Sequence, residues 1–199
     1  MKKNLKKVIS AVVAFALTAS SAAFAAAPSF TDVADTASYA EAVNTLTALG
    51  VISGYEDGTF KPDDKITRAE VSTMIVAAIN RTADAQGQMG NTKFADMNNE
   101  AKKWASGYVN VAVSEDIIAG FEDGTFKPDE QVTYVQVVKM LVCAAGYGQY
   151  ASYLGGWPNG YLSVASDKGI TAGVSAGQDE AVTRGQVAQL IYNTLDVPM

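Results

Sequence analysis

Two arginines lie in the first turn of predicted helices, where a positive charge does not stabilise the helix. Arg68 and Arg184 each follow a threonine that opens an apolar segment of helical periodicity. The positive end of the helix dipole lies there, so a cation is unfavourable for the helix itself. An anion held between the guanidinium and free backbone N–H groups would remove this conflict, and the pattern therefore predicts an anion-binding site. The alternative is that each arginine pairs with a nearby acid, such as Asp57 or Asp63 for Arg68.

Aromatic side chains at matched positions suggest a second kind of contact. Trp104 and Trp157 both lie early in predicted helices. The flat face of an indole suits the apolar face of a sugar ring, but a tryptophan also serves as a packing wedge between helices. Tyr134 follows Thr133 at the start of a third apolar segment, in the place that Arg68 and Arg184 take in theirs. It could stack on a sugar but supplies no charge.

Five polar side chains complete the candidate ligand-binding set. Three of them follow a threonine at the spacing of a helix capping box, and two precede a glycine in a predicted turn. Helix capping and turn formation are the simpler explanations for all five, with ligand contact as the alternative. These residues are Glu70, Gln136, Gln186, Asp57 and Asp123.

The composition excludes several function classes. The 199 residues carry a formal net charge of −6, contain no histidine and include one cysteine. An acidic chain is a poor partner for nucleic acid. Without histidine, the commonest general base and the commonest zinc ligand are missing, so we expect no catalytic site, no metal site and no cofactor. Cys143 lies in an apolar run, cannot form an internal disulfide and is expected to be a small buried hydrophobic residue.

The first 25 residues have the pattern of a secretory signal peptide. Four lysines precede an apolar region over residues 8–19, and a small-x-small pattern ends at Ala25. The apolar region is shorter than the roughly 20 residues that a transmembrane helix needs. We therefore expect export and cleavage after Ala25, which would change the net charge from −6 to −10. An uncleaved amphipathic anchor is the alternative.

The rest of the chain repeats itself. Residues 54–62 and 120–128 are identical except for Tyr55 and Phe121. At the same offset Ile66–Glu70 corresponds to Val132–Gln136, and a third copy follows at Val182–Gln186. An array of short units that share one core is the usual meaning of such self-similarity.

Each unit is predicted to be a helix, a loop and a second helix. The first helices are expected over residues 39–49, 104–114 and 160–168, with Gly50 and Gly169 at helix ends that favour positive φ. The second helices are expected to begin at Thr67, Thr133 and Thr183, followed by an apolar face. No unit of this size buries such a face alone, so the three second helices are expected to pack together.

These motifs resemble the S-layer homology (SLH) domain family. The resemblance rests on Phe30-Thr-Asp-Val33, Gly50-Val-Ile-Ser-Gly-Tyr55, Asp57-Gly-Thr-Phe-Lys-Pro62 and Ile66-Thr-Arg-Ala-Glu70, and it extends over residues 29–196. It implies an all-α fold with long loops, in which three tandem repeats surround a central helix bundle with pseudo-threefold symmetry. It also implies non-covalent attachment to an anionic, often pyruvylated, secondary cell wall polymer at grooves between repeats. A pyruvyl carboxylate on a sugar is the kind of anion that Arg68 and Arg184 could bind.

The resemblance divides the chain into residues 1–25 (signal peptide), 26–82, 83–146 and 147–199 (the three repeats). The pattern departs at Ser38, where the first repeat lacks tryptophan, and at Tyr134. The third repeat lacks the Asp-Gly-Thr-Phe-x-Pro loop. One or two working grooves are therefore expected, on a chain exported to the cell wall or S-layer surface.

The sequence also bears on three other functions. A calcium loop with Gly58 in sixth position would place Ser53 and Tyr55 at its first and third ligands. In the second copy Ala119 and Phe121 would take these places, and aliphatic or aromatic side chains cannot supply these ligands. A wall hydrolase would need two converging carboxylates, whereas the acids here fall in repeated caps and turns. An assembly role through contacts with other surface proteins remains open.

Overall fold

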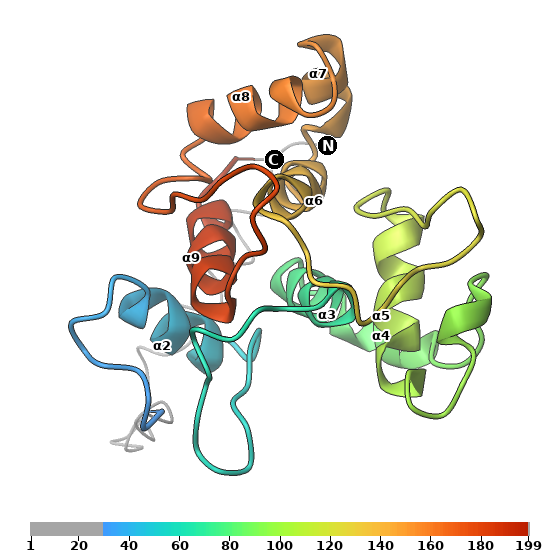
Figure 1. Cartoon of the computed structure of the whole chain (residues 1–199), viewed down its shortest axis with the longest axis horizontal. Coiled ribbons are helices and arrows are strands. Elements are labelled where there is room, and N and C mark those ends of the chain that lie inside the picture. The colour runs from blue at the N-terminus through green and yellow to red at the C-terminus, as the bar shows by residue number, and fades with distance from the viewer. Residues whose placement is uncertain (1–29, 199) are drawn as a thin grey trace, which may run out of the picture.

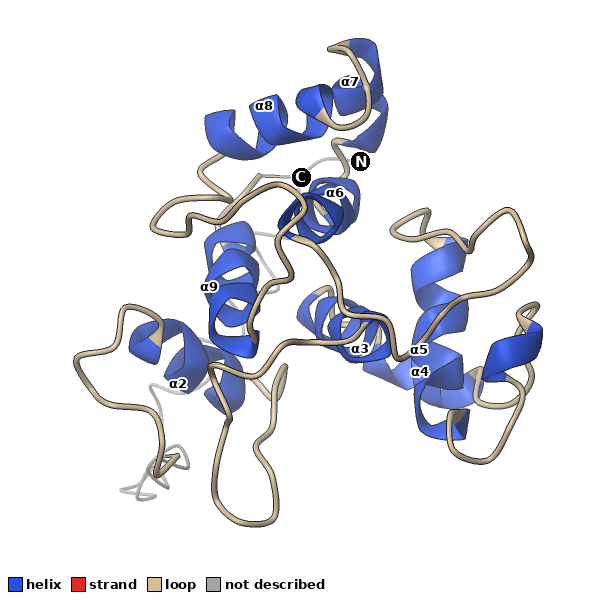
Figure 2. Cartoon of the chain, viewed as in Figure 1, coloured by secondary structure: helices blue, strands red, loops and turns tan. Residues whose placement is uncertain are grey.

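The computed structural model describes residues 30–198 of the chain, and the predicted signal peptide lies outside them. The described part is helical, as predicted, with long loops and isolated β-bridges in place of sheets (Figure 2). No helix in residues 30–198 has the length and apolar character needed to cross a membrane. The elements are α2 (Ala40–Ala48), α3 (Arg68–Ala78), α4 (Thr82–Gly87), η2 (Ala95–Met97), α5 (Lys103–Ser114), α6 (Tyr134–Ala144), α7 (Gly148–Tyr153), α8 (Asn159–Asp167) and α9 (Arg184–Leu195).

The helices α3, α6 and α9, here called the central helices, begin at the predicted threonines. At each start, the side-chain oxygen of the Glu or Gln at the third helical position accepts a hydrogen bond from the threonine N–H, at 2.9, 3.1 and 2.9 Å. The hydroxyls of Thr67 and Thr183 accept in return from the backbone N–H of that residue, at 3.3 Å in both cases. Local sequence therefore fixes where the central helices start.

A ring of three backbone hydrogen bonds joins the segments that precede these helices. The N–H of Ile66 donates to Val182 O (3.3 Å), that of Val182 donates to Val132 O (3.1 Å), and that of Val132 donates to Ile66 O (3.1 Å). All three side chains are fully buried. The ring closes head to tail, so each of the three segments is bonded to both of the others.

The helices α2, α5 and α8, here called the outer helices, lie around the central ones (Figure 1). They agree closely with the predicted first helices. Each packs against a central helix from elsewhere in the sequence: α5 against α3, α8 against α6, and α2 against α9. The first helix of the described chain therefore lies against the last, and the Tyr192 hydroxyl on α9 donates to Glu41 Oε1 on α2 at 2.9 Å.

The short helices α4 and α7 were not predicted. Each packs on the next outer helix, α4 on α5 and α7 on α8. A glycine allows the close approach in both places. A Cβ added at Gly107 would lie 1.8 Å from Ala85 O, and one at Gly160 would lie 2.1 Å from Ala151 O. These two glycines therefore mark helix contacts that have no room for a side chain.

Turns at the ends of the outer helices follow the expected pattern. Gly50 and Gly169 have φ values of +70° and +74°, as predicted for residues just past a helix end. Asp116 takes the same conformation in the second repeat, with φ at 56°. The left-handed turn is therefore kept even where the sequence supplies no glycine.

Candidate functional site

The start of each central helix is covered by a loop from elsewhere in the chain. The N–H groups of Arg68 and Ala69 donate to Glu130 O (2.9 Å) and Pro128 O (3.0 Å). In the same way α6 donates from Tyr134 and Val135 to Glu180 O and Gln178 O, and α9 donates from Arg184 and Gly185 to Asp64 O and Pro62 O. The expectation of free N–H groups for an anion is therefore wrong, because protein carbonyls already occupy them.

Arg68 holds the loop of the second repeat from the side. Its Nε donates to Phe126 O at 2.9 Å and its Nη2 donates to Ala119 O at 3.1 Å. The guanidinium carbon lies 4.7 Å from the ring centre of Phe121 and 4.9 Å from that of Phe126. The side chain is buried, and burial lowers the pKa of Arg68 while Glu130 and Asp96 oppose the shift. Aromatic faces and carbonyl oxygens thus surround this cation.

The alternative partners for Arg68, Asp57 and Asp63, are wrong. Within residues 30–198, none of the ion pairs closer than 4.0 Å involves Arg68. Its two side-chain hydrogen bonds go to neutral carbonyls, which leave the positive charge uncompensated at short range.

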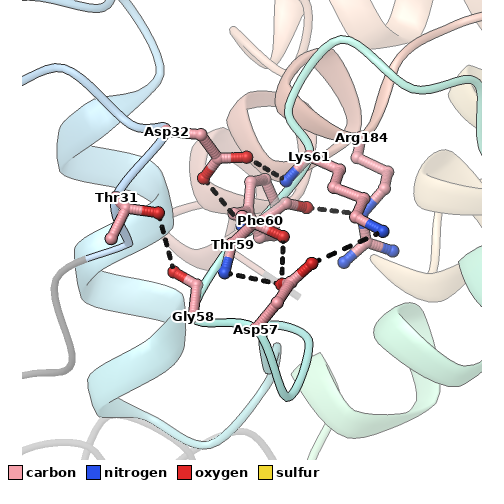
Figure 3. Close-up of polar contacts among 8 residues, drawn as sticks. All are labelled: Thr31, Asp32, Asp57, Gly58, Thr59, Phe60, Lys61 and Arg184. Carbon is pink, nitrogen blue, oxygen red and sulfur yellow. Dashed lines mark hydrogen bonds and ion pairs between the residues drawn. The ribbon is translucent and has the colours of Figure 1, made fainter.

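Arg184 holds the loop of the first repeat in the same manner (Figure 3). Its Nε donates to Phe60 O at 2.9 Å. Its Nη2 donates to Ser53 O at 3.5 Å. Its guanidinium carbon lies 5.1 Å from the ring centre of Tyr55. Unlike Arg68, it has a carboxylate neighbour, because its Nη1 lies 3.8 Å from Glu70 Oε1.

Tyr134 takes the place of the arginine at the start of α6. It is buried, with 8% of its surface exposed. Burial raises the pKa of its hydroxyl, and a hydrogen bond with Thr171 opposes the shift. The start of α6 therefore presents a neutral side chain where α3 and α9 present a cation.

Asp57 and Asp123 shape the tips of the first and second loops. Asp57 Oδ1 accepts from the N–H and hydroxyl of Thr59 at 3.0 and 2.6 Å. Asp123 Oδ1 accepts from the same groups of Thr125 at 2.9 and 2.6 Å. These hydrogen bonds lower the pKa of both carboxyls. Both aspartates thus have the turn-forming role that was the simpler explanation.

Two further aspartates, which are not among the predicted site residues, hold the loops. The carboxylate of Asp32 accepts from the N–H groups of Phe60 (2.8 Å) and Lys61 (2.7 Å), as Figure 3 shows. Asp96 does the same for Phe126 (2.9 Å) and Lys127 (2.7 Å). The sequence feature that could have indicated this role is the opening Phe-x-Asp motif, whose aspartate lies about 30 residues before the loop that it holds.

Close packing explains two glycines in the loops of the first and second repeats. A Cβ at Gly54 would lie 2.1 Å from Phe30 Cε1, and one at Gly120 would lie 2.2 Å from Phe94 Cε1. Neither glycine has a positive φ. Both are needed for the approach of the opening phenylalanine, whereas Gly173, with φ at +73°, does serve a turn.

A groove of about 790 Å³ brings together four of the predicted site residues. Arg68 comes from the start of α3, Asp123 from the second loop, Gln136 from α6, and Trp157 from the segment before α8. The remaining lining residues are Ile117, Ile118, Ala119, Gly120, Phe121, Glu122, Lys127, Lys139 and Met140. Parts of the chain far apart in sequence thus form one concave surface.

Cations and an open aromatic face characterise this groove. Trp157 is 52% exposed, which argues against the role of a packing wedge. Lys139 Nζ lies 5.6 Å from the Trp157 ring centre and 5.7 Å from that of Tyr161. Lys139 was missed, although it lies three residues after Gln136 and so on the same helix face. Arg68, Lys127 and Lys139 outnumber the two acids of the lining, Glu122 and Asp123.

The other candidates lie elsewhere. Trp104, at the start of α5, is 48% exposed and is not among the groove residues. Glu70 caps α3 and lies beside Arg184. Gln186 caps α9, and its Nε2 donates to Ser175 O at 3.5 Å. The structure therefore does not bring Trp104, Glu70 and Gln186 into the groove at Arg68. Cys143 is only partly buried, and burial raises the pKa of its thiol.

Comparison with known proteins finds matches to one family. Residues 29–72 and 93–137 match the S-layer homology domain. The chain is 38% identical to a "Middle cell wall protein" of Brevibacillus brevis, over 98% of this chain and 18% of that protein. It is 34% identical to a "Cell surface protein" of Thermoanaerobacter kivui, over 99% of this chain and 25% of that protein.

A shorter match is to a "Cellulosome-anchoring protein" of Acetivibrio thermocellus, which is 31% identical over 56% of this chain and 25% of that protein. The chain thus spans about a quarter or less of the length of these relatives. Their names point to a location at the cell wall or S-layer surface. Together with the matched loops and helix starts, these similarities identify the chain as one that carries two S-layer homology repeats, at residues 29–72 and 93–137.

Proposed function

We propose that this chain anchors a surface protein non-covalently to an anionic secondary cell wall polymer, which it binds in the groove at Arg68. The observation behind the proposal is that cations and an aromatic ring meet in this groove. A buried arginine without a carboxylate within 4.0 Å in residues 30–198 lies in one groove with two lysines and a half-exposed tryptophan. Cations gathered in one groove raise the local positive potential, which attracts an anion.

The groove suits a carboxylated sugar. Trp157 offers an open indole face for the apolar side of a pyranose ring. Lys127 and Lys139 line the same groove and can pair with a carboxylate, which would come from a pyruvyl group on the sugar. Arg68 adds positive potential to the groove while its two hydrogen bonds keep the loop in place. Binding, with no catalytic step, is the role that this arrangement supports.

The relatives support the anchoring role. S-layer homology repeats occur here in a chain similar to cell wall and cellulosome-anchoring proteins. We further propose that residues 147–199 form a divergent third repeat, because α9 has the same capping box and closes the same ring as α3 and α6. Residues 26–82 and 83–146 would be the first two repeats, preceded by a signal peptide in residues 1–25.

Co-sedimentation with cell wall sacculi tests the proposal. Wild-type chain is expected to bind intact sacculi and to lose binding when the secondary polymer is removed chemically. Lys139→Ala is expected to weaken binding by up to about fivefold, and added salt should weaken it further, because the contact is ionic and partly exposed. Equal binding to stripped sacculi would contradict the proposal.

Two tryptophans of similar exposure provide a matched comparison. Trp157→Ala is expected to weaken binding because it removes the stacking face of the groove. Trp104→Ala removes an equally exposed indole at the corresponding position of the second repeat, outside the groove. If both substitutions weaken binding equally, the groove at Arg68 is not the principal site.

Assembly with other surface proteins is the second candidate, and one observation favours it. Large apolar side chains at α7 are exposed, with Tyr153 at 85%, Tyr150 at 50% and Leu154 at 42%. Association through this surface would strengthen in high salt, whereas glycan binding through cations would weaken. Sedimentation velocity of the purified chain at low and high salt distinguishes the two.

A further inference from the structure

The helices α4 and α7 make the same contact in the fold. They lie 66 residues apart in the sequence, at the offset that also relates the two copies of the loop motif. Each buries an alanine completely, Ala85 in α4 and Ala151 in α7, against the glycine of the following outer helix. The helix α4 therefore shows which residues this contact requires, and α7 can be compared with it position by position.

The exposed positions of the two segments carry different chemistry. Where α4 and its C-cap have Asp84, Gly87 and Gln88, α7 and its C-cap have Tyr150, Tyr153 and Leu154. These last three residues, here called the α7 face, are all exposed within residues 30–198. Because α4 packs on its outer helix without large apolar side chains at these positions, the fold does not require the α7 face.

The α7 face lies in a part of the chain that has no charges. Residues 140–166 contain no Asp, Glu, Lys or Arg, and no other stretch within residues 30–198 is as long without one. Next to α7, Lys168 Nζ lies 5.1 Å from the ring centre of Tyr147 and 3.0 Å from Asp167 Oδ2, so this ion pair adds no net charge. Figure 1 shows α7 at the periphery of the molecule, where a partner can reach it.

The charge of the remaining surface bears on what that partner is. Four of the 15 basic residues and none of the 21 acids precede residue 30, so residues 30–198 carry a net charge of −10. Two copies of such a chain repel each other, and the repulsion is least where the surfaces that meet carry no charge. A tyrosine hydroxyl both donates and accepts hydrogen bonds, so it can pair with its own copy, which a charged group cannot do. The α7 face is therefore complementary to itself.

We propose that two copies of this chain associate through their α7 faces, around a twofold axis that places one face against the other. Such an interface is closed and stops at two copies. The inference rests on the assembly candidate described above, whose partner it names, and it is independent of polymer binding. Because the face is small, the association is weak and reversible. Two associated copies would hold a wall polymer at two points, which raises the avidity without any new contact to the polymer.

Sedimentation velocity of the chain purified after export measures the association, over the micromolar to millimolar concentrations that suit a small interface. The average mass of the wild type is expected to rise from that of one copy to that of two and no further. A mass that stays at one copy overturns the inference. A mass that continues to rise beyond two copies overturns the closed twofold arrangement and the inference with it.

The chain itself supplies the test substitutions. Tyr150→Asp, Tyr153→Gly and Leu154→Gln together give α7 the residues that α4 has at these positions. This triple variant is expected to weaken the association about tenfold or more, because it removes the apolar area of the face. Leu49→Gln, at an exposed leucine after α2, is the matched control and should associate like wild type.

A milder variant guards against loss of folding. The side chain of Tyr153 is almost fully exposed, so Tyr153→Gln is expected to keep the circular dichroism spectrum of the wild type while it weakens the association. If the triple variant and Tyr153→Gln both associate as strongly as wild type, the contact lies elsewhere and the inference is wrong.

A mixing experiment shows whether the face meets itself. A trace of fluorescently labelled triple variant is sedimented with an excess of unlabelled wild type. The labelled variant is expected to remain a single copy, because it lacks the face that the wild type would bind. If it joins the wild type, the α7 face binds a different surface of the second copy, and the twofold pairing is overturned.

Binding to sacculi separates this inference from the anchoring function. The triple variant keeps Lys139 and Trp157, so it is expected to co-sediment with intact sacculi. A wild type that binds sacculi but stays a single copy contradicts this inference alone. A wild type that associates without binding sacculi contradicts the anchoring function and supports this inference.

Discussion

Arg68 and Arg184 show how one buried side chain can hold a loop that is distant in sequence. Each crosses to a loop from another part of the chain, 58 and 124 residues away respectively, and donates two hydrogen bonds to its carbonyl oxygens. The planar guanidinium also stacks on aromatic rings of the same loop. A lysine cannot reproduce this geometry, because its ammonium group has no rigid fork of donors.

Arg68→Lys is therefore expected to lower the free energy of unfolding by about 1–3 kcal/mol, the range for leaving buried hydrogen-bonding groups unsatisfied. Urea denaturation followed by circular dichroism measures this change. Lys65→Arg offers the reverse exchange at an exposed position and should be nearly neutral. Equal stability of Arg68→Lys and wild type would show that the loop is held without the guanidinium.

Acid should loosen the loop tips before it affects the helices. The pKa values of Asp57 and Asp123 are lowered by hydrogen bonds from Thr59 and Thr125 that exist only in the folded loop. A lowered folded pKa means that the stabilisation is complete above the ordinary pKa of 3.8 and is lost as the pH falls through the folded value.

Unfolding midpoints measured from about pH 5 down to about pH 2 should decline as these two carboxylates take up protons. The double variant Asp57→Asn and Asp123→Asn should show a shallower decline, because an amide oxygen accepts the same hydrogen bonds without titrating. An unchanged slope in the double variant would mean that other carboxylates account for the acid sensitivity.

Among the candidate site residues, sequence could predict what depends on near neighbours. Thr67 and Glu70 lie three residues apart, so their reciprocal capping is local and was predicted correctly. The partners of Arg68 could not be predicted in this way, since the carbonyls it binds come from a distant loop. The same holds for the groove, where Trp157 joins Arg68 only after three parts of the chain have packed.

At the level of the elements, the packing of the short helices depends on glycines, which have no side chain. The central helices and outer helices carry enough apolar periodicity to be predicted with nearly correct ends. The six-residue helices α4 and α7 are too short for such a pattern. Gly107 and Gly160 leave the space into which these helices pack, but this role can be recognised only once the packed neighbour is known.

Gly107→Ala is expected to destabilise the chain by about 1–3 kcal/mol, because the added methyl would meet the backbone of α4 and force it away from α5. Thermal unfolding of the variant measures the effect. Gly87→Ala is the matched control, since a Cβ at Gly87 meets nothing within 4 Å. A neutral Gly107→Ala would mean that α4 can move away from α5 without cost.

At the scale of the whole described chain, the ring of hydrogen bonds through Ile66, Val132 and Val182 links all three central helices. Val132→Pro removes one donor, because proline has no N–H. Hydrogen exchange should then show faster exchange at the two remaining ring amides as well as near residue 132, because each ring segment is bonded to both others. Val132→Ala keeps the donor and loses only side-chain packing.

Val132→Ala should therefore lower global stability and leave the relative protection of the ring amides unchanged. If Val132→Pro speeds exchange only within the second repeat, the three segments open independently. In that case the ring would be a set of separate contacts with no cooperative effect.

The packing of α2 against α9 has a consequence for how the chain can come apart. A linear stack of repeats has two terminal units, and each of these has one neighbour fewer and frays first. Here the first and last helices of the described chain cover each other, so the array has no outermost unit. On the three-repeat arrangement proposed above, the closed circle cannot be shortened to two members without leaving a gap, which gives a physical reason to retain residues 147–199. Loss of the helices α8 and α9 of that segment would open the circle.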